Sequence, residues 1–138
     1  MKVSEAMTRD VVLAKPNQTL REVADIMSQK DIGALPVAEG DRLVGMITDR
    51  DIVIRAVAEG KGPDTKVTEI MTEQIRYCFE DEDLGDVSKN MAGIQMRRLP
   101  VMNRRKELVG ILSLADMATS QAAAPQLHKA LKGISQPM

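Results

Sequence analysis

Two short motifs in the chain place a hydroxyl and a carboxylate at the same spacing. Thr48-x-x-Asp51 and Ser113-x-x-Asp116 each follow an apolar run, at a point where a strand is expected to turn into a helix. A carboxylate can accept hydrogen bonds from the hydroxyls of a ribose, and a helix N-terminus offers N–H donors to an anion. The same spacing is also the capping-box pattern, which closes the unpaired N–H groups of a helix. Capping and ribose-phosphate binding are therefore both open, and they do not exclude each other.

These motifs belong to an internal repeat that runs through most of the chain. Residues Lys2–Thr8 return as Lys66–Thr72, and Leu35–Val37 returns as Leu99–Val101, both at an offset of 64. After one inserted residue, Leu43-Val44-Gly45 matches Leu108-Val109-Gly110 at an offset of 65. A duplicated half-domain indicates one pseudo-symmetric body, in which a site formed at the junction of the halves occurs twice.

Composition and charge are those of an ordinary globular chain. The 138 residues are 43% hydrophobic and 28% charged, with a formal net charge of −1. This balance gives no argument for nucleic acid or an acidic membrane surface as a partner. No apolar run approaches 18 residues, and the polar N-terminus does not resemble a secretion signal, so we expect a cytoplasmic protein.

Residue types that perform catalysis are scarce. Cys78 is the only cysteine, which excludes an internal disulfide, and the only histidine, His128, lies in the C-terminal tail. Neither a GxxxxGKS phosphate loop nor a cluster with metal-ligand spacing is present in the sequence. Tyr77 and Phe79 are the only aromatic residues, too few for a base-stacking platform. We therefore expect no enzyme and no metal site.

Each repeat predicts the order strand, helix, hairpin, helix. Thr19 and Glu22 form a capping-box pattern before a helix that Gly33 is expected to end. The apolar face of that helix comprises Leu20, Val23, Ala24 and Met27, and that of its copy Leu84, Val87, Met91 and Ile94. Extended segments are expected at residues 11–13 and 75–77, and second helices at about 49–59 and 114–121. The Ile52–Val57 stretch is apolar around more of its circumference than a solvent-facing helix needs. We therefore expect a partner subunit to cover part of this surface.

The ordered blocks resemble a pair of CBS motifs, the arrangement called a Bateman module. The resemblance rests on three blocks and their copies. They are Val3-x-x-x-Met7-Thr8, Gly33–Val37 and Leu43–Asp51, with Val67-x-x-x-Met71-Thr72, Arg97–Val101 and Leu108–Asp116. It implies an α/β (α+β) fold of two pseudo-symmetric motifs, each a small three-stranded sheet packed by two helices. The expected boundaries are 1–60 for the first motif, 61–64 for a linker, 65–122 for the second motif and 123–138 for a tail with a short helix.

The resemblance further implies two ligand clefts between the repeats. In one, Asp116 would hold ribose hydroxyls, with Ser113 near the phosphate and Arg97 and Arg98 supplying positive charge. Ile32, Gly33 and Ser4 are its base-side candidates. In the other, Asp51 and Thr48 take these roles, with Met96 and Thr68 opposite. Arg50 partly compensates there for the missing arginine pair, but Asp49 adds a negative charge beside it, so we favour the Asp116 cleft for a phosphorylated ligand.

The function that follows is a stand-alone regulatory protein. It would sense an adenine nucleotide, with AMP favoured over ATP, NAD or S-adenosylmethionine, and it would need no obligatory cofactor. We expect a homodimer that modulates an effector protein of unknown identity, with no nucleic acid or membrane partner. Two rivals stay open: a ligand-free scaffold for dimerisation or docking, and nucleotide turnover at the cleft, against which the lack of an evident base counts.

Overall fold

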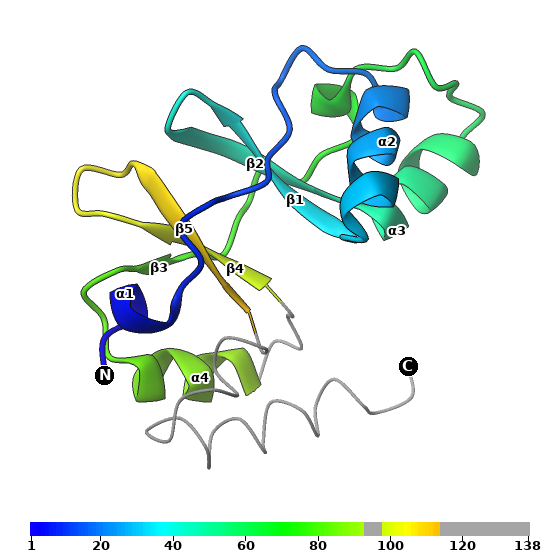
Figure 1. The fold of residues 1–138 in the computed structure, drawn as a ribbon. Helices are drawn as coiled ribbons and strands as arrows, with labels where there is room; N and C mark the ends of the chain where they lie inside the picture. The colour runs from blue at the N-terminus through cyan, green and yellow to red at the C-terminus, as the bar shows by residue number, and fades with distance from the viewer. Residues whose placement is uncertain (93–97, 114–138) are drawn as a thin grey trace. The chain divides into compact units, whose positions relative to one another are not determined.

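The structure is a computed structural model that describes residues 1–92 and 98–113 (Figure 1). Several predicted features lie outside these ranges: Ile94 of the second helix face, the site candidates Met96, Arg97 and Asp116, the helix at 114–121 and the tail at 123–138.

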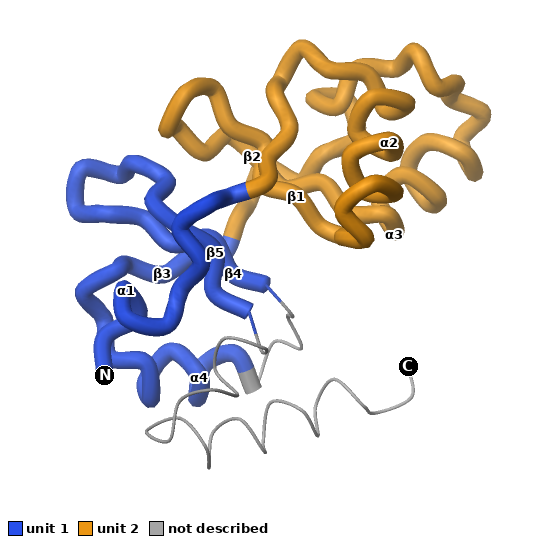
Figure 2. The backbone as a smooth tube through the Cα atoms, in the orientation of Figure 1, with its two compact units in different colours: residues 1–11, 76–138 blue, residues 12–75 orange. Residues whose placement is uncertain are grey.

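The chain forms two compact units (Figure 2). Unit 1 contains residues 1–11 and 76–138, and unit 2 contains residues 12–75. These units do not coincide with the two sequence repeats. The first eleven residues join the second half of the chain, and the equivalent residues 65–75 join the first half. We call 1–11 and 65–75 the lead segments; because they are exchanged, each unit is built from both repeats.

Helix α2 (Leu20–Lys30) of unit 2 begins at the predicted capping box. The Thr19 hydroxyl accepts from the Glu22 N–H at 3.3 Å, and the Glu22 carboxylate accepts from the Thr19 N–H at 3.2 Å. Leu20, Val23 and Met27 are buried, as their spacing predicts. The predicted end at Gly33 is wrong. The helix ends at Lys30, and its C-cap Asp31 has a left-handed φ of 53°, a conformation that the short polar side chain of Asp tolerates.

Strands β1 (Ala34–Glu39) and β2 (Arg42–Thr48) form the predicted antiparallel hairpin, with a bulge after Val37. Gly40 supplies the positive φ of 63° that the turn requires. The expected third strand is reduced to a single parallel bridge from Ala14 to Val37. It stops there because the Lys15 N–H turns to the Gln18 side chain at 2.8 Å and Pro16 has no N–H to donate.

The second predicted helix of the first repeat is present. It starts as α3 (Asp49–Asp51) and continues as a π-helical segment, Ile52–Val57, in which only Ala56 is buried. A short 3-10 helix, Val67–Glu69, follows in the exchanged lead segment.

Unit 1 repeats the pattern with a complete sheet. Helix α1 (Val3–Ala6) and helix α4 (Leu84–Ala92) accompany strands β3 (Cys78–Phe79), β4 (Arg98–Met102) and β5 (Leu108–Ser113). The sheet order is β3-β4-β5, with β3 parallel to β4 and β4 antiparallel to β5. The strand expected at 75–77 lies slightly later, because the backbone pairs with β4 only at Cys78 and Phe79.

Each unit encloses its own aliphatic core. That of unit 1 contains Val3, Cys78, Leu84, Val87, Met91, Leu99, Val101 and Leu112. That of unit 2 contains Ala14, Leu20, Val23, Met27, Leu35, Val37, Ile47, Ala56, Val67 and Ile70. Val3 and Val67, the equivalent residues of the two lead segments, are both fully buried in the unit that their segment joins. No helix in the described part of the chain is long and apolar enough to cross a membrane.

The lead segments pack against a glycine in the second strand of each hairpin. In unit 1, Thr8 exchanges two backbone hydrogen bonds with Ile111, each 2.9 Å long. In unit 2, Thr72 makes the same pair with Met46, also at 2.9 Å. A Cβ atom on Gly110 would lie 3.0 Å from the Thr8 carbonyl oxygen, and one on Gly45 would lie 3.1 Å from that of Thr72. Only glycine allows this approach without displacing backbone.

Gly110→Ala should therefore lower the free energy of unfolding by about 1–3 kcal/mol, the usual range for overpacking a well-filled interior. The added methyl group would meet both the Met7 side chain and the Thr8 backbone. Chemical denaturation of both proteins measures the difference. Gly62→Ala is the control, because a Cβ there meets nothing within 4 Å. Equal stability of the Gly110 variant and this control would contradict the packing described.

Candidate functional site

The Thr48–Asp51 motif forms a complete capping box at the junction of β2 and α3. The Asp51 N–H donates to the Thr48 hydroxyl at 3.0 Å, and the Thr48 N–H donates to Asp51 Oδ2 at 3.1 Å. The capping interpretation is thus confirmed for the first repeat. It does not consume the carboxylate, since an ionised carboxylate has about four acceptor positions. Asp51 is half-buried and keeps acceptor capacity for a ligand hydroxyl.

Asp49 already places a negative charge at the start of this helix. Its Oδ1 accepts from the Arg50 N–H at 2.8 Å, while its own N–H donates to the Gly33 carbonyl at 2.9 Å. A Cβ atom on Gly33 would lie 2.8 Å from Asp49 Oδ2, so this carboxylate lies directly against the glycine. An anionic ligand at the helix N-terminus would meet both the charge and the bulk of Asp49.

Arg55 connects the carboxylate of Asp51 to the exchanged lead segment. Arg55 Nε lies 4.0 Å from Asp51 Oδ1, and Arg55 Nη1 donates to the Ile70 carbonyl at 3.2 Å. Arg55 is not part of the predicted site, although its spacing of four from Asp51 is the signal for an ion pair along a helix. Thr68, predicted for this site, is exposed in the 3-10 helix two residues before Ile70.

The remaining candidates of unit 2 lie around the same junction. Ile32 packs against the core, and its N–H donates to the Met27 carbonyl at 3.0 Å. Gly33 and Arg50 are exposed. The structure therefore brings Gly33, Thr48 and Asp51 together, and the side chain of Asp49, the first residue of α3, lies against the glycine.

The equivalent junction of unit 1 is described only in part. Arg98, at the start of β4, lies opposite Ser113, the last residue of β5, and both are half-buried. Ser4 lies in α1, where its N–H donates to the Glu80 carbonyl at 2.9 Å. Arg97, Asp116 and Met96 lie outside the described residues, so the full donor set of this junction stays a prediction.

Other kinds of site find little support in the described ranges. No group of three or more His, Cys, Asp or Glu side chains there is arranged to hold a metal ion. Cys78 is buried in the core of unit 1, and this burial, aided by the negative charge of Glu82, raises its pKa to about 12. A thiol in this environment is protonated at neutral pH and is not a nucleophile.

Comparison with known proteins agrees with the repeat and the fold. The family model described as "CBS domain" matches residues 3–57 and 67–122. The CBS domain-containing protein YhcV of Bacillus subtilis is 41% identical over 133 residues, which cover 96% of this chain and 94% of that protein.

Two similar solved structures contain adenosyl ligands. The CBS domain protein PAE2072 from Pyrobaculum aerophilum, complexed with AMP, has a TM-score of 0.76 and 27% identity, with 93% of this chain and 98% of that chain covered. The CBS domain pair of protein MJ0100, in complex with 5'-methylthioadenosine and S-adenosyl-L-methionine, has a TM-score of 0.73 and 29% identity, with coverages of 86% and 98%.

The burial of Cys78 predicts slow alkylation of the folded protein. A rise in pKa from 9.0 to about 12 lowers the thiolate fraction at pH 8 roughly a thousandfold. Iodoacetamide labelling, followed by mass spectrometry, should thus be about three orders of magnitude slower in the native chain than in concentrated urea. Native and unfolded rates within tenfold of each other would show that the thiol is accessible and ionised.

Proposed function

Because the chain belongs to the CBS domain family, we propose that it is a regulatory protein that binds an adenine nucleotide and changes the state of a partner. Its ligand is held by the Ser113-x-x-Asp116 motif of the second repeat. AMP is the favoured nucleotide.

The observation that carries this proposal is the geometry of the equivalent junction in unit 2. There the hydroxyl and the carboxylate of the motif lie side by side at the start of a helix, within 3.1 Å hydrogen bonds of the backbone. Such an arrangement holds the carboxylate in a fixed position, where it accepts the hydroxyls of a ribose. Similar proteins of this family bind AMP or S-adenosylmethionine in the structures named above.

Three differences between the junctions favour the second one for a phosphorylated ligand. Asp49, which lies against the start of α3, is replaced by Leu114 in the copy, so that negative charge is missing from its sequence. The copy also has Arg97 and Arg98 where the first repeat has Gly33 and Ala34. The guanidinium groups of Arg97 and Arg98 would attract a phosphate and repel the positively charged sulfonium of S-adenosylmethionine. For this reason AMP is favoured.

Binding would act by shifting a pre-existing equilibrium. A ligand changes the balance between two conformations only to the extent that it binds one of them more tightly. The partner then reads the conformation that the nucleotide favours. No chemical step is assigned to the site.

The main alternative is a scaffold that binds no nucleotide. It is favoured by the first junction, where Thr48 and Asp51 already cap the helix and Asp49 places a negative charge in its first turn. Under this alternative, the motif serves only to begin the helix.

Self-association is the second part of the proposal. Val53, Ile54 and Val57 are 58%, 46% and 66% exposed on one short helical segment, an unusual concentration of large aliphatic surface. We expect this face to be buried in a homodimer.

Asp116→Ala should abolish stabilisation by AMP. In the parent protein, ligand at a hundredfold excess over its Kd adds about 2.7 kcal/mol of stability, which a thermal shift assay detects. The matched control is Asp51→Ala, which removes the carboxylate half of the capping box at the first junction. The control should keep its response to AMP, because Asp49 already disfavours phosphate there.

The same thermal shift assay with AMP, ADP, ATP, NAD and S-adenosylmethionine distinguishes a nucleotide-binding protein from a scaffold. No shift with any of them, in a folded sample, would establish the scaffold instead. A full response in Asp116→Ala together with a lost response in Asp51→Ala would place the ligand at the first junction.

Ile54→Glu should raise the monomer fraction, because a charge in a buried aliphatic interface leaves an unpaired ion on both sides. Sedimentation velocity measures the mass directly. Gln29→Glu, which adds the same charge at an exposed position of α2, should leave the mass unchanged. An identical mass for the Ile54 variant and the parent would remove this helix from the interface.

A further inference from the structure

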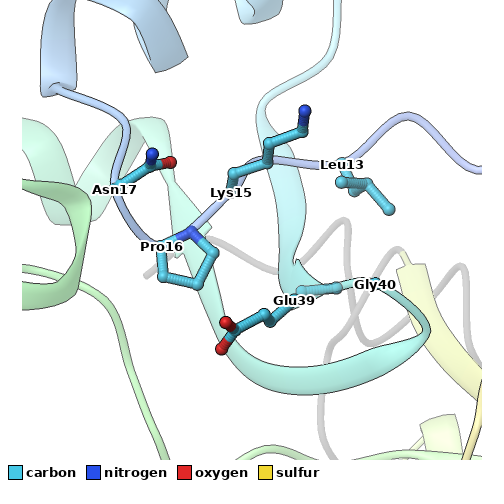
Figure 3. A pocket seen from close by; sticks show the side chains of 7 residues that line it. Leu13, Lys15, Pro16, Asn17, Glu39 and Gly40 are labelled. Carbon is cyan, nitrogen blue, oxygen red and sulfur yellow. The ribbon is translucent and has the colours of Figure 1, made fainter.

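Unit 2 contains a cavity of about 340 Å³ that is distinct from the junction at Thr48 (Figure 3). It lies between the segment 13–17, which includes the β-bridge residue Ala14, and the turn that joins β1 to β2. Leu13, Pro16 and Ala38 supply its apolar lining, and Lys15 and Glu39 supply its charges. The volume is near the lower limit for small-molecule sites, about 300–1,000 Å³.

At the equivalent place in unit 1, side chains of the protein itself stack on one another. At the offset of 64, Lys15 corresponds to Phe79, Asn17 to Asp81 and Gly40 to Arg104. The Arg104 guanidinium lies 4.0 Å from the centre of the Phe79 ring and makes two hydrogen bonds, of 2.9 and 2.8 Å, to the Asp81 carboxylate. This stack has no counterpart in unit 2.

In unit 2, Lys15, Asn17 and Gly40 stand where unit 1 has the residues of the stack, and the cavity is open. Gly40 has no side chain to lay across the preceding segment, and a Cβ there would meet nothing within 4 Å. In unit 1 the Arg104 cation packs on the Phe79 ring at this place, whereas in unit 2 Lys15 and Gly40 leave the place open to a group from outside the unit.

Two opposite charges at the cavity have no partner in the described residues. Neither the Lys15 ammonium nor the Glu39 carboxylate makes a hydrogen bond or ion pair there, and Figure 3 shows their charged ends apart rather than paired. The neighbouring ammonium of Lys66 is occupied, since it donates to the Asn17 carbonyl at 3.0 Å. The free groups are thus one cation and one anion.

We propose that this cavity binds a free α-amino acid with an aliphatic side chain. The Glu39 carboxylate accepts hydrogen bonds from the α-ammonium, and Lys15 donates to the α-carboxylate. The aliphatic side chain packs against Leu13, Pro16 and Ala38. A nucleotide fits poorly, because its phosphate would meet a single lysine and be repelled by Glu39.

L-leucine is the probe that tests this proposal. Titration into protein with ¹³C-labelled methyl groups should shift the NMR signals of Leu13 and Ala38 in a saturable manner. Glu39→Gln should weaken the binding at least tenfold, because it removes one charged partner of the ammonium. Glu59→Gln, an exposed acid of the same unit that does not line the cavity, should bind L-leucine like the parent.

Two ligand analogues test the pairing of both charges. Leucinamide lacks the carboxylate and 4-methylpentanoate lacks the ammonium, so each should bind at least tenfold more weakly than L-leucine. Lys15→Phe, which introduces the residue of the equivalent position in unit 1, should fill the cavity and abolish the shifts while the protein stays folded.

No saturable shift of the Leu13 and Ala38 signals, or equal shifts with L-leucine and both analogues, would overturn the proposal. Undiminished binding by Lys15→Phe would do the same. These outcomes are independent of the nucleotide proposal, since Asp116→Ala should bind L-leucine like the parent.

Discussion

The close backbone contact between each lead segment and a strand glycine is the constraint on which the rest of the structure depends. Thr8 pairs with Ile111 beside Gly110, and Thr72 pairs with Met46 beside Gly45. Because each segment belongs in sequence to one repeat and in space to the other unit, neither repeat completes its core alone. The duplication is therefore one of sequence, whereas the units that bury apolar surface are composites of both copies.

The exchange could not be read from the sequence, although the elements could. Capping boxes at Thr19 and Thr48, both hairpins and the buried helix faces follow from local rules of spacing and hydrogen bonding. Which copy a lead segment packs against is decided by long-range contacts with one of two similar hairpins, and no local pattern in the segment itself indicates which one. The misplaced helix end at Asp31 has a smaller cause: an aspartate took the left-handed position that glycine usually fills.

The residues of the motif could be predicted from the sequence, but the contacts that surround them could not. The Thr48 and Asp51 side chains of the first junction form the expected capping box. The ion pair with Arg55 and the position of Asp49 against Gly33 became visible only in the structure. Asp49 and Gly33, which make one of these contacts, are replaced by Leu114 and Arg97 in the sequence of the second repeat. Comparison of the two units also draws attention to the cavity near Lys15, because the stack of Arg104 on Phe79 in unit 1 is missing from unit 2.

Hydrogen exchange in Val3→Ala tests the composite units most directly. Val3 belongs to the first repeat but is fully buried among core residues of the second. The truncation should therefore accelerate amide exchange at Val101 and Leu112 and leave Val37 and Ile47 close to their parent values. Loss of protection confined to Val37 and Ile47 would mean that Val3 stabilises its own repeat, and would contradict the exchange of lead segments.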